Sequence, residues 1–290
     1  MQKAHIVLDC QNHHGEGVFW NSTDQRVWWT DIMGQKIWSF DPVTNVSQSF
    51  NVPSPVCCFA PRRQGGLIVA FADRISFYDL NSGQEEVIYE FEPDNSETRL
   101  NDGRIDRQGN LVVGGMNEVS GEANSSVIRV GQDGKVSTLI EGVACANSIC
   151  FSADGKQMFF TDSPEKQIRV YDYEPTLTML SKSRLHGDFT QLTGLPDGSC
   201  IDSDGGVWNA VWEGNCVVRV GPYGTIDQIV DVPVWKPTCC AFGGPDLDTL
   251  YITTSCLMSS EERISREPGS GGLFGFKPGS RGITDQPFAG

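Results

Sequence analysis

The stretch ANSICFSADGKQMFFTDS, residues 146–163, contains the pattern that decides the fold. A small or polar lead-in precedes an apolar run, an Asp-Gly turn and a second run rich in aromatic residues. Units of this kind recur six times, and their second runs begin at Val27, Leu67, Leu111, Met158, Val207 and Leu250. Successive starts lie roughly 40 to 50 residues apart, which is the repeat length of β-propeller blades.

Six such units predict an all-β, six-bladed β-propeller that occupies residues 1–290 as a single domain. The last repeat ends near Phe276, before a fourth strand is complete, whereas the run HIVLDC, residues 5–10, precedes the first repeat. We expect this run to supply the missing outer strand and close the ring, because closure removes exposed sheet edges. The alternative is a loose N-terminal strand. A helical turn is expected only within residues 259–266.

The composition argues against several classes of partner. The chain has 22 Lys and Arg against 37 Asp and Glu, a net charge of −15. Nucleic acid and anionic membranes are therefore not expected partners, and a neutral small molecule is favoured as substrate. No apolar run is long enough to span a membrane, and the N-terminus lacks signal-peptide features. We expect a cytoplasmic protein that is a monomer or a small homo-oligomer.

The ten cysteines are expected to be reduced, mostly buried thiols rather than disulfides. Two adjacent pairs, Cys57 with Cys58 and Cys239 with Cys240, lie inside strand-like runs. No Cys-x-x-Cys motif occurs, so a thiolate zinc site is not expected. None of the cysteines is predicted to be a nucleophile.

Matching positions of different blades meet around the axis of a propeller, so the repeat itself predicts where a site forms. Counting back from each second strand reaches the head of each inner strand. The six residues found there are Glu16, Cys57, Asn101, Asn147, Asp197 and Thr238. Hard divalent cations prefer carboxylate and amide oxygens, so we predict a cation site at this mouth of the channel. Turn formation is the alternative role of these residues. His13 and His14 are assigned to an exposed loop, and a position near the mouth is the alternative.

The predicted topology brings further residues to the same mouth. Connections between second and third strands return there, and the longest span residues 117–126, which include Glu118, and residues 255–271. The connection 185–195 is expected to enter the same face. For each of these three connections, a surface insertion without a role at the site is the alternative. Arg99 lies two residues before Asn101, so both side chains can point into the channel. A salt bridge from Arg99 to Asp102 or Glu97 is the alternative.

Six motifs follow one another along nearly the whole chain. They are GEGVFW (15–20), RLNDGRID (99–106), GGMNE (114–118), ANSICFSADG (146–155), PDGSCIDSDGGVW (196–208) and CCAFGGPDLDTLYITTS (239–255). In this order they resemble the senescence marker protein/gluconolactonase family, the regucalcin-like sugar lactonases. The resemblance implies a six-bladed propeller that binds one divalent metal and hydrolyses aldonolactones.

Carried over to this chain, the resemblance implies metal ligands at Glu16, Asn147 and Asp197. It implies substrate contacts at Arg99, Asn101 and Glu118. The chain departs from the family pattern at Gly115, where Thr is usual. It also departs at residues 212–215, where Trp-Glu-Gly-Asn replaces a glycine-rich run. The family's substrate preferences are therefore not transferred.

These observations predict a metal-dependent hydrolase that opens the ester ring of a sugar lactone in carbohydrate metabolism. Asp197 is the predicted general base, and metal-bound hydroxide is the alternative nucleophile. The set of Glu, Asn and Asp ligands suits calcium, zinc, manganese or ferrous iron. Two other functions stay open: a calcium-binding regulatory propeller without turnover, and a related propeller that hydrolyses aryl esters or phosphotriesters.

Overall fold

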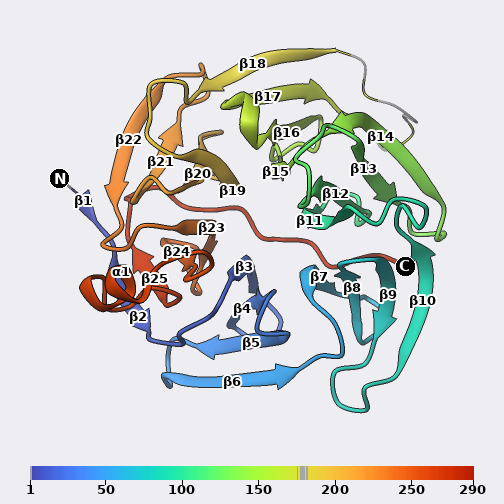
Figure 1. Cartoon of the computed structure of the whole chain (residues 1–290), viewed down its shortest axis with the longest axis horizontal. Coiled ribbons are helices and arrows are strands. Elements are labelled where there is room, and N and C mark those ends of the chain that lie inside the picture. Colours follow the sequence, from blue (N-terminus) through green and yellow to red (C-terminus); the bar gives the residue numbers. More distant parts are fainter. Residues whose placement is uncertain (1, 175, 177–179, 181) are drawn as a thin grey trace.

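The computed structural model describes residues 2–174, 176, 180 and 182–290. Its sheets form a ring of six blades, viewed along the axis in Figure 1. The first three blades contain β3 (Gly15–Asn21), β4 (Arg26–Asp31), β5 (Lys36–Asp41) and β6 (Val46–Asn51); β7 (Val56–Pro61), β8 (Leu67–Phe71), β9 (Arg74–Tyr78) and β10 (Glu85–Glu90); and β11 (Thr98–Ile105), β12 (Leu111–Asn117), β13 (Ser125–Val130) and β14 (Val136–Val143).

The other three blades complete the ring. They contain β15 (Ala146–Phe151), β16 (Gln157–Asp162), β17 (Gln167–Asp172) and β18 (Ser183–Asp188); β19 (Leu195–Ile201), β20 (Val207–Trp212), β21 (Cys216–Val220) and β22 (Ile226–Asp231); and β23 (Pro237–Gly243), β24 (Thr249–Thr254) and β25 (Leu273–Phe276) with β2 (His5–Leu8). The predicted six-bladed propeller is confirmed.

The N-terminal run closes the ring as predicted. Strand β2 pairs antiparallel with β25, so the last blade is built from both ends of the chain. The sequence did not predict β1 (Gln2–Lys3), which pairs parallel with β22 of the preceding blade. The N-terminal segment therefore contacts two neighbouring blades.

The hairpins between inner and second strands in the third and fifth blades are formed by Asp-x-x-Gly turns. Asp106 accepts hydrogen bonds from the backbone N–H groups of Gln108 and Asn110, both at 2.9 Å. Asp202 does the same for Asp204 and Gly206. The glycine that follows in these turns has a positive φ, +92° at Gly109 and +82° at Gly205. Such a backbone conformation favours glycine, which explains the recurring Asp-x-x-Gly signal.

Helical structure is short. The predicted helical turn is α1 (Glu261–Arg266), in the connection between β24 and β25, and Ser260 caps it by accepting from the Arg263 N–H. A 3-10 turn at Ser163–Glu165 was not predicted. In the part of the chain that the structure describes, no helix is long and apolar enough to cross a membrane.

The connection predicted at residues 185–195 is shorter than expected. Residues up to Asp188 belong to β18, and only residues 189–194 link it to β19. The error arose because β18 is an exposed outer strand, and its sequence, SRLHGD, lacks the continuous apolar run that marks the inner strands.

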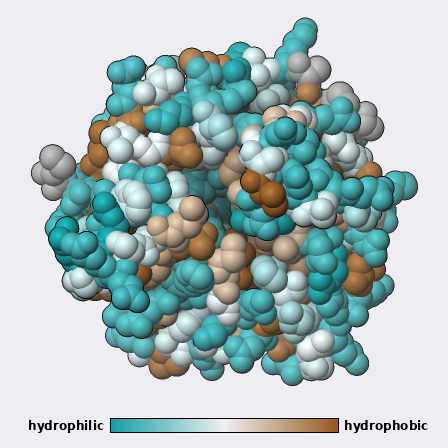
Figure 2. All heavy atoms as spheres, viewed as in Figure 1, coloured by the Kyte–Doolittle hydropathy of each residue, from teal (hydrophilic) through white to brown (hydrophobic). Residues whose placement is uncertain are grey.

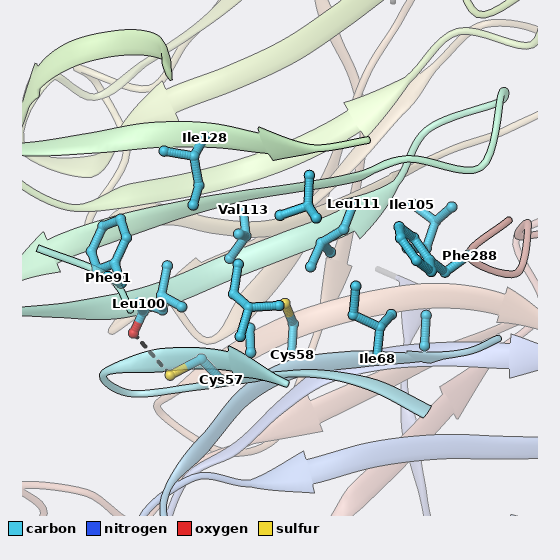
Figure 3. Packing of buried hydrophobic residues seen from close by; sticks show 14 residues of the cluster. Cys57, Cys58, Ile68, Phe91, Leu100, Ile105, Leu111, Val113, Ile128 and Phe288 are labelled. Carbon is cyan, nitrogen blue, oxygen red and sulfur yellow. Dashed lines mark hydrogen bonds between the residues drawn. The ribbon is translucent and has the colours of Figure 1, made fainter. Parts of the chain in front are cut away.

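Buried apolar side chains fill the spaces between neighbouring blades. The cluster in Figure 3 joins β7 to β11, with Cys57 and Cys58 packed near Leu100. The Cys57 thiol donates to the Leu100 carbonyl at 2.8 Å. All ten cysteines are free thiols, in agreement with the prediction. Because each blade packs on the next, the inner strands are held rigidly around the axis.

The C-terminal segment, residues 277–290, crosses the ring beneath the inner strands (Figure 1). It is bonded to the far-end hairpins, for example from the Ala289 N–H to the Gly109 carbonyl at 2.9 Å. Phe288 is fully buried in the cluster between the second and third blades (Figure 3). Asp285 forms an ion pair with Arg104 at 3.0 Å. The segment thus covers one end of the channel, which the sequence did not predict.

Candidate functional site

The six positions selected by the repeat share one backbone irregularity. In every blade the pairing between inner and second strand shifts register at or next to them, as between Glu16 and Phe19 and between Asn147 and Cys150. The other four blades shift at the corresponding place. A bulge leaves residues outside the ladder and re-aims their side chains. Here the bulges occur at the mouth of the channel, where the inner strands begin.

A cavity of about 200 Å³ lies at this mouth. Figure 2, drawn from the same side as Figure 1, shows the molecule hollowed near its centre. Five predicted site residues line the cavity: Glu16, Arg99, Asn101, Asn147 and Asp197. The prediction that these residues converge is therefore confirmed, although their roles remain predictions.

The remaining two positions of the same repeat phase do not line the cavity. Cys57 turns to the Leu100 carbonyl, and Thr238 donates to the Gly15 carbonyl at 2.5 Å. Burial raises the pKa of the Cys57 thiol to about 11, which keeps it protonated at neutral pH. That no cysteine is a nucleophile stays a prediction.

The orientation of Asn147 follows from its neighbours. The Ser163 hydroxyl has one proton and donates it to the Pro196 carbonyl at 2.7 Å. It must therefore accept from the Asn147 amide nitrogen, which lies 2.9 Å away. Asn147 Oδ1 is left facing Asn101 Nδ2, 3.4 Å away. The structure thus presents the oxygen of Asn147, and not its NH₂ group, toward Asn101.

Glu16 and Asp197 form an electronegative pair. Both side chains are buried, and Glu16 Oε2 accepts from the Gly17 N–H at 3.0 Å. Burial and the nearby Asp102 carboxylate raise the pKa of Glu16 to about 8. Burial and then Glu16 raise the pKa of Asp197 well above its ordinary value. Buried carboxylates are costly without a compensating charge, so this pair favours a bound cation.

Asp102, the residue after Asn101, is a third buried carboxyl near the site, and it was not among the predicted site residues. It accepts from the Ile149 N–H at 2.9 Å, and burial raises its pKa. The signal was present in the RLNDG motif. The repeat phase selected only one residue in each inner strand, whereas Asp102, the residue after the selected Asn101, is close enough to raise the pKa of both Glu16 and Asp197.

Arg99 is held in place by three acceptors. It contacts Glu118 Oε2 at 2.7 Å, the Leu100 carbonyl at 2.8 Å and Asn101 Oδ1 at 3.0 Å. The alternative salt bridges to Asp102 or Glu97 are not formed. Glu97 instead accepts from Asn117 and Ser120. Arg99 is thus fixed beside Asn101.

Glu118 does not line the cavity, and its side chain is 46 % exposed. Its contact with the site is the ion pair with Arg99. The sequence placed Glu118 in the correct connection, between β12 and β13, but could not determine which cation it pairs with.

The assignment of His14 to an exposed loop was wrong, whereas His13 is exposed as predicted. His14 is buried, lines the cavity and lies edge-on to Trp212. Its Nδ1 lies 2.9 Å from Ser255 Oγ. Burial, with a smaller effect from Arg99, lowers the pKa of His14 to about 3, so the ring is neutral. The connection after β24, which covers this residue, is distant in sequence.

Whether the site can hold a metal ion depends on the side-chain amide oxygen of Asn147. Among the described residues, no group of three or more His, Cys, Asp and Glu side chains is arranged to hold a metal ion. The predicted ligand set has only two such residues, Glu16 and Asp197, and takes its third oxygen from Asn147. Two carboxylates and an amide oxygen suit a hard cation that completes its shell with water.

A second, larger cavity of about 400 Å³ lies at the opposite end of the channel. Its carboxylate, Asp285, is already paired with Arg104. The paired carboxyls and the oriented amide belong to the smaller cavity, so the chemistry favours that one.

Comparisons with known proteins identify the family of this chain. Residues 14–256 match the model of the SMP-30/Gluconolactonase/LRE-like region. The chain is 36 % identical to L-arabinolactonase of Azospirillum brasilense over 99 % of this chain and 96 % of that one. It is 31 % identical to regucalcin of Xenopus laevis, with 95 % of each covered.

A solved structure has the same arrangement of blades. The calcium-binding protein regucalcin from Agrobacterium tumefaciens superposes with a TM-score of 0.92 at 25 % identity, covering 99 % of this chain and 97 % of the other. The family model, the relatives and the fold all lead to one conclusion. The chain belongs to the SMP-30/gluconolactonase/LRE-like family.

Proposed function

We propose that this protein is a metal-dependent hydrolase that opens the ester ring of a sugar lactone to the sugar acid. The observation that carries the proposal is the single cavity in which Glu16, Asn147 and Asp197 meet Arg99 and Asn101. The name of the arabinolactonase relative supports a sugar lactone as the substrate class. The cavity volume of about 200 Å³ suits one small ring.

Glu16, Asn147 and Asp197 would hold one divalent cation through side-chain oxygens. A bound cation would polarise the lactone carbonyl and stabilise negative charge that develops on its oxygen. The description of a similar solved structure as calcium-binding favours calcium. Zinc, manganese and ferrous iron are the alternatives to be tested.

Asp197 would act as the general base that removes a proton from the attacking water. A carboxylate that burial has made more basic than usual is suited to this task. Arg99, held by Glu118 and Asn101, would donate hydrogen bonds to substrate oxygens from a fixed position. Glu118 is exposed enough to accept from a ring hydroxyl as well.

A second candidate function is supported by the names of two similar proteins. Regucalcin of Xenopus laevis and the calcium-binding regucalcin structure favour a calcium-binding propeller that has no turnover. Such a protein would need the same three ligands but no base and no oriented Arg99. The two functions therefore differ in whether Arg99 and Asp197 support hydrolysis.

The test is a panel of five- and six-carbon aldonolactones, with an aryl ester and a phosphotriester as controls. Protein is first freed of metal with a chelator, and each of the four cations is then added back. We expect lactone opening to disappear on chelation and return with one cation, and the aryl ester and the phosphotriester to react poorly. Calcium binding without opening of any lactone would favour the regulatory function. Preferred hydrolysis of the controls would assign the site to apolar esters.

A further inference from the structure

The connection between β24 and β25 covers one side of the cavity. Leu257 and Met258, near its start, line the cavity together with Trp212 from the end of β20. The Met258 side chain is 85 % exposed, so it has little packing of its own. The position of this wall therefore depends on how the backbone at Leu257 is held.

Lys236 holds the backbone at Leu257. This lysine is only 1 % exposed, although lysine is almost never fully buried without a partner. Its ammonium donates to the Leu257 carbonyl at 2.6 Å and lies 3.5 Å from Glu213 Oε1. Lys236 immediately precedes β23, so the contact joins the connection to the rigid inner part of the ring.

Two indole rings surround the same ammonium. Lys236 Nζ lies 4.6 Å from the centre of the Trp212 ring and 4.3 Å from that of Trp235. Both distances are within the range of favourable cation–π interactions, which strengthen when the cation is desolvated. Lys236 therefore links both walls of the cavity, Trp212 by its ring and Leu257 by its backbone.

Other contacts fix the same connection independently. Arg263 of α1 lies over the Trp235 ring at 4.1 Å, and Glu267 accepts from the backbone N–H of Trp235 at 2.8 Å. Ser255 Oγ contacts His14 and donates to the His13 carbonyl. These anchors lie on either side of residues 257 and 258. Two side chains bond to the backbone of Leu257 itself. Ser255 Oγ accepts from its N–H at 3.0 Å, and Lys236 Nζ donates to its carbonyl at 2.6 Å. Of these two, Lys236 is the one that also contacts Trp212 on the other wall.

We propose that Lys236 is a positioning residue that sets the width of the cavity between Trp212 and residues 257–258, and so selects lactones by size. The inference rests on the proposed lactonase function. Glu213, 3.5 Å away, balances the charge of the buried ammonium. A different residue at position 236 would leave the ligands and Arg99 intact while changing which substrate fits.

The test compares the unaltered protein with Lys236→Met, which keeps the length of the side chain and removes the ammonium. We expect kcat/KM for a five-carbon aldonolactone to fall about 10-fold relative to that for a six-carbon one, the low end of the discrimination expected for one carbon unit. The change should appear in KM, with kcat within about twofold, because Lys236 does not line the cavity. Lys277→Met is the matched control, since Lys277 forms an exposed ion pair with Asp248.

Hydrogen exchange of residues 255–272 gives a readout that does not depend on activity. Lys236→Met should exchange faster there, and Lys277→Met should not. Should Lys236→Met fold poorly, Trp235→Leu removes one ring from the ammonium without touching the cavity lining, and should shift the ratio in the same direction by about 2- to 3-fold.

An unchanged ratio of the two lactones, or an equal loss for both with unchanged exchange, would overturn the proposal. If the unaltered protein opens no lactone, the proposed function fails and selection by size fails with it. Hydrogen exchange then tests by itself whether Lys236 holds the connection in place. Faster exchange of residues 255–272 in Lys236→Met would support this role, and unchanged exchange would contradict it.

Discussion

Asp197 occupies a Pro-Asp-Gly sequence that is equally suitable for a turn, and its surroundings distinguish the two roles. Its side chain is buried, lines the cavity and has a raised pKa because burial and Glu16 disfavour a second negative charge. A turn aspartate, such as Asp154, is instead exposed and bonded to its own turn. For a single aspartate, burial and a neighbouring negative charge therefore distinguish a site residue from a turn residue.

The first prediction concerns Asp197→Asn, which keeps the size and one oxygen but removes the basicity. At saturating cation, lactone turnover should fall at least about 10²-fold, the low end for the loss of a general base. Asp154→Asn, at the far-end turn of the β15–β16 hairpin, is the control and should retain normal turnover. Near-normal turnover in Asp197→Asn would remove the base role from this residue.

The second prediction follows from the carboxyl of Glu16. In the folded protein without cation, burial and Asp102 raise its pKa to about 8 from an ordinary value of 4.5. The folded state thus retains a proton that the unfolded chain loses above pH 4.5. Its stabilising contribution is complete below that pH and is lost as pH rises toward 8.

Thermal unfolding of chelated protein between pH 5 and 9 measures this effect. The midpoint of chelated protein should fall across the range, and saturating cation or Glu16→Gln should each reduce the slope. If chelated protein were instead most stable at the alkaline end, Glu16 would not carry the proton.

At the scale of elements, the bulges and the crossing segment have different roles. The bulges at the heads of the inner strands aim side chains into the cavity. The C-terminal segment occupies the other end of the channel and packs Phe288 between the second and third blades. Stability and chemistry are thus concentrated at opposite ends of the same strands.

This separation predicts that Phe288→Ala affects stability and leaves activity intact. Removal of a fully buried aromatic ring should lower the free energy of unfolding by about 3–5 kcal/mol. KM and kcat at a temperature where the protein remains folded should change less than about twofold, because Phe288 does not line the site cavity. Denaturant unfolding measures the first quantity, with Tyr223→Ala, at a 97 % exposed position, as the neutral control. A large change in KM would mean that the two ends of the channel are coupled.

At the scale of the whole molecule, the ring depends on strand β2. This strand pairs with β25 and supplies the outer edge of the last blade, while the inner strand of that blade, β23, packs against β3 of the first. Without β2, the edge of β25 would be free to pair with another chain.

Deletion of residues 2–9 should therefore lower the unfolding temperature and promote association, measured by thermal unfolding and size-exclusion chromatography. Deletion of residues 2 and 3 is the control, because it removes the two pairs of β1 with β22 and the exposed ion pair of Lys3 with Asp231, and leaves β2 in place. It should change the midpoint by a few degrees at most. Equal behaviour of the two deletions would show that β2 is dispensable for closure.

The sequence alone determined the six blades, the closure by residues 5–10 and the convergence of Glu16, Asn101, Asn147 and Asp197. It could do so because each blade is encoded locally, by strand-forming runs separated by short turns, and repetition carries matching positions to one axis. The position of Arg99, two residues before Asn101, allowed both side chains to point into the channel but left a salt bridge to Asp102 or Glu97 as the alternative. None of these inferences required knowledge of a contact between distant segments.

The tertiary structure decided what depends on contacts between segments far apart in the chain. The connection after β24 buries His14, and Arg99 pairs with Glu118 rather than with Glu97 or Asp102. Phe288 packs into a hydrophobic cluster whose other members precede it by more than 150 residues in the sequence. Lys236 contacts the Leu257 carbonyl and two indole rings. Burial and pairing of these side chains arise only once the ring closes, because the partners then come within a few ångströms. Local sequence cannot specify which partner a charge or ring will find there.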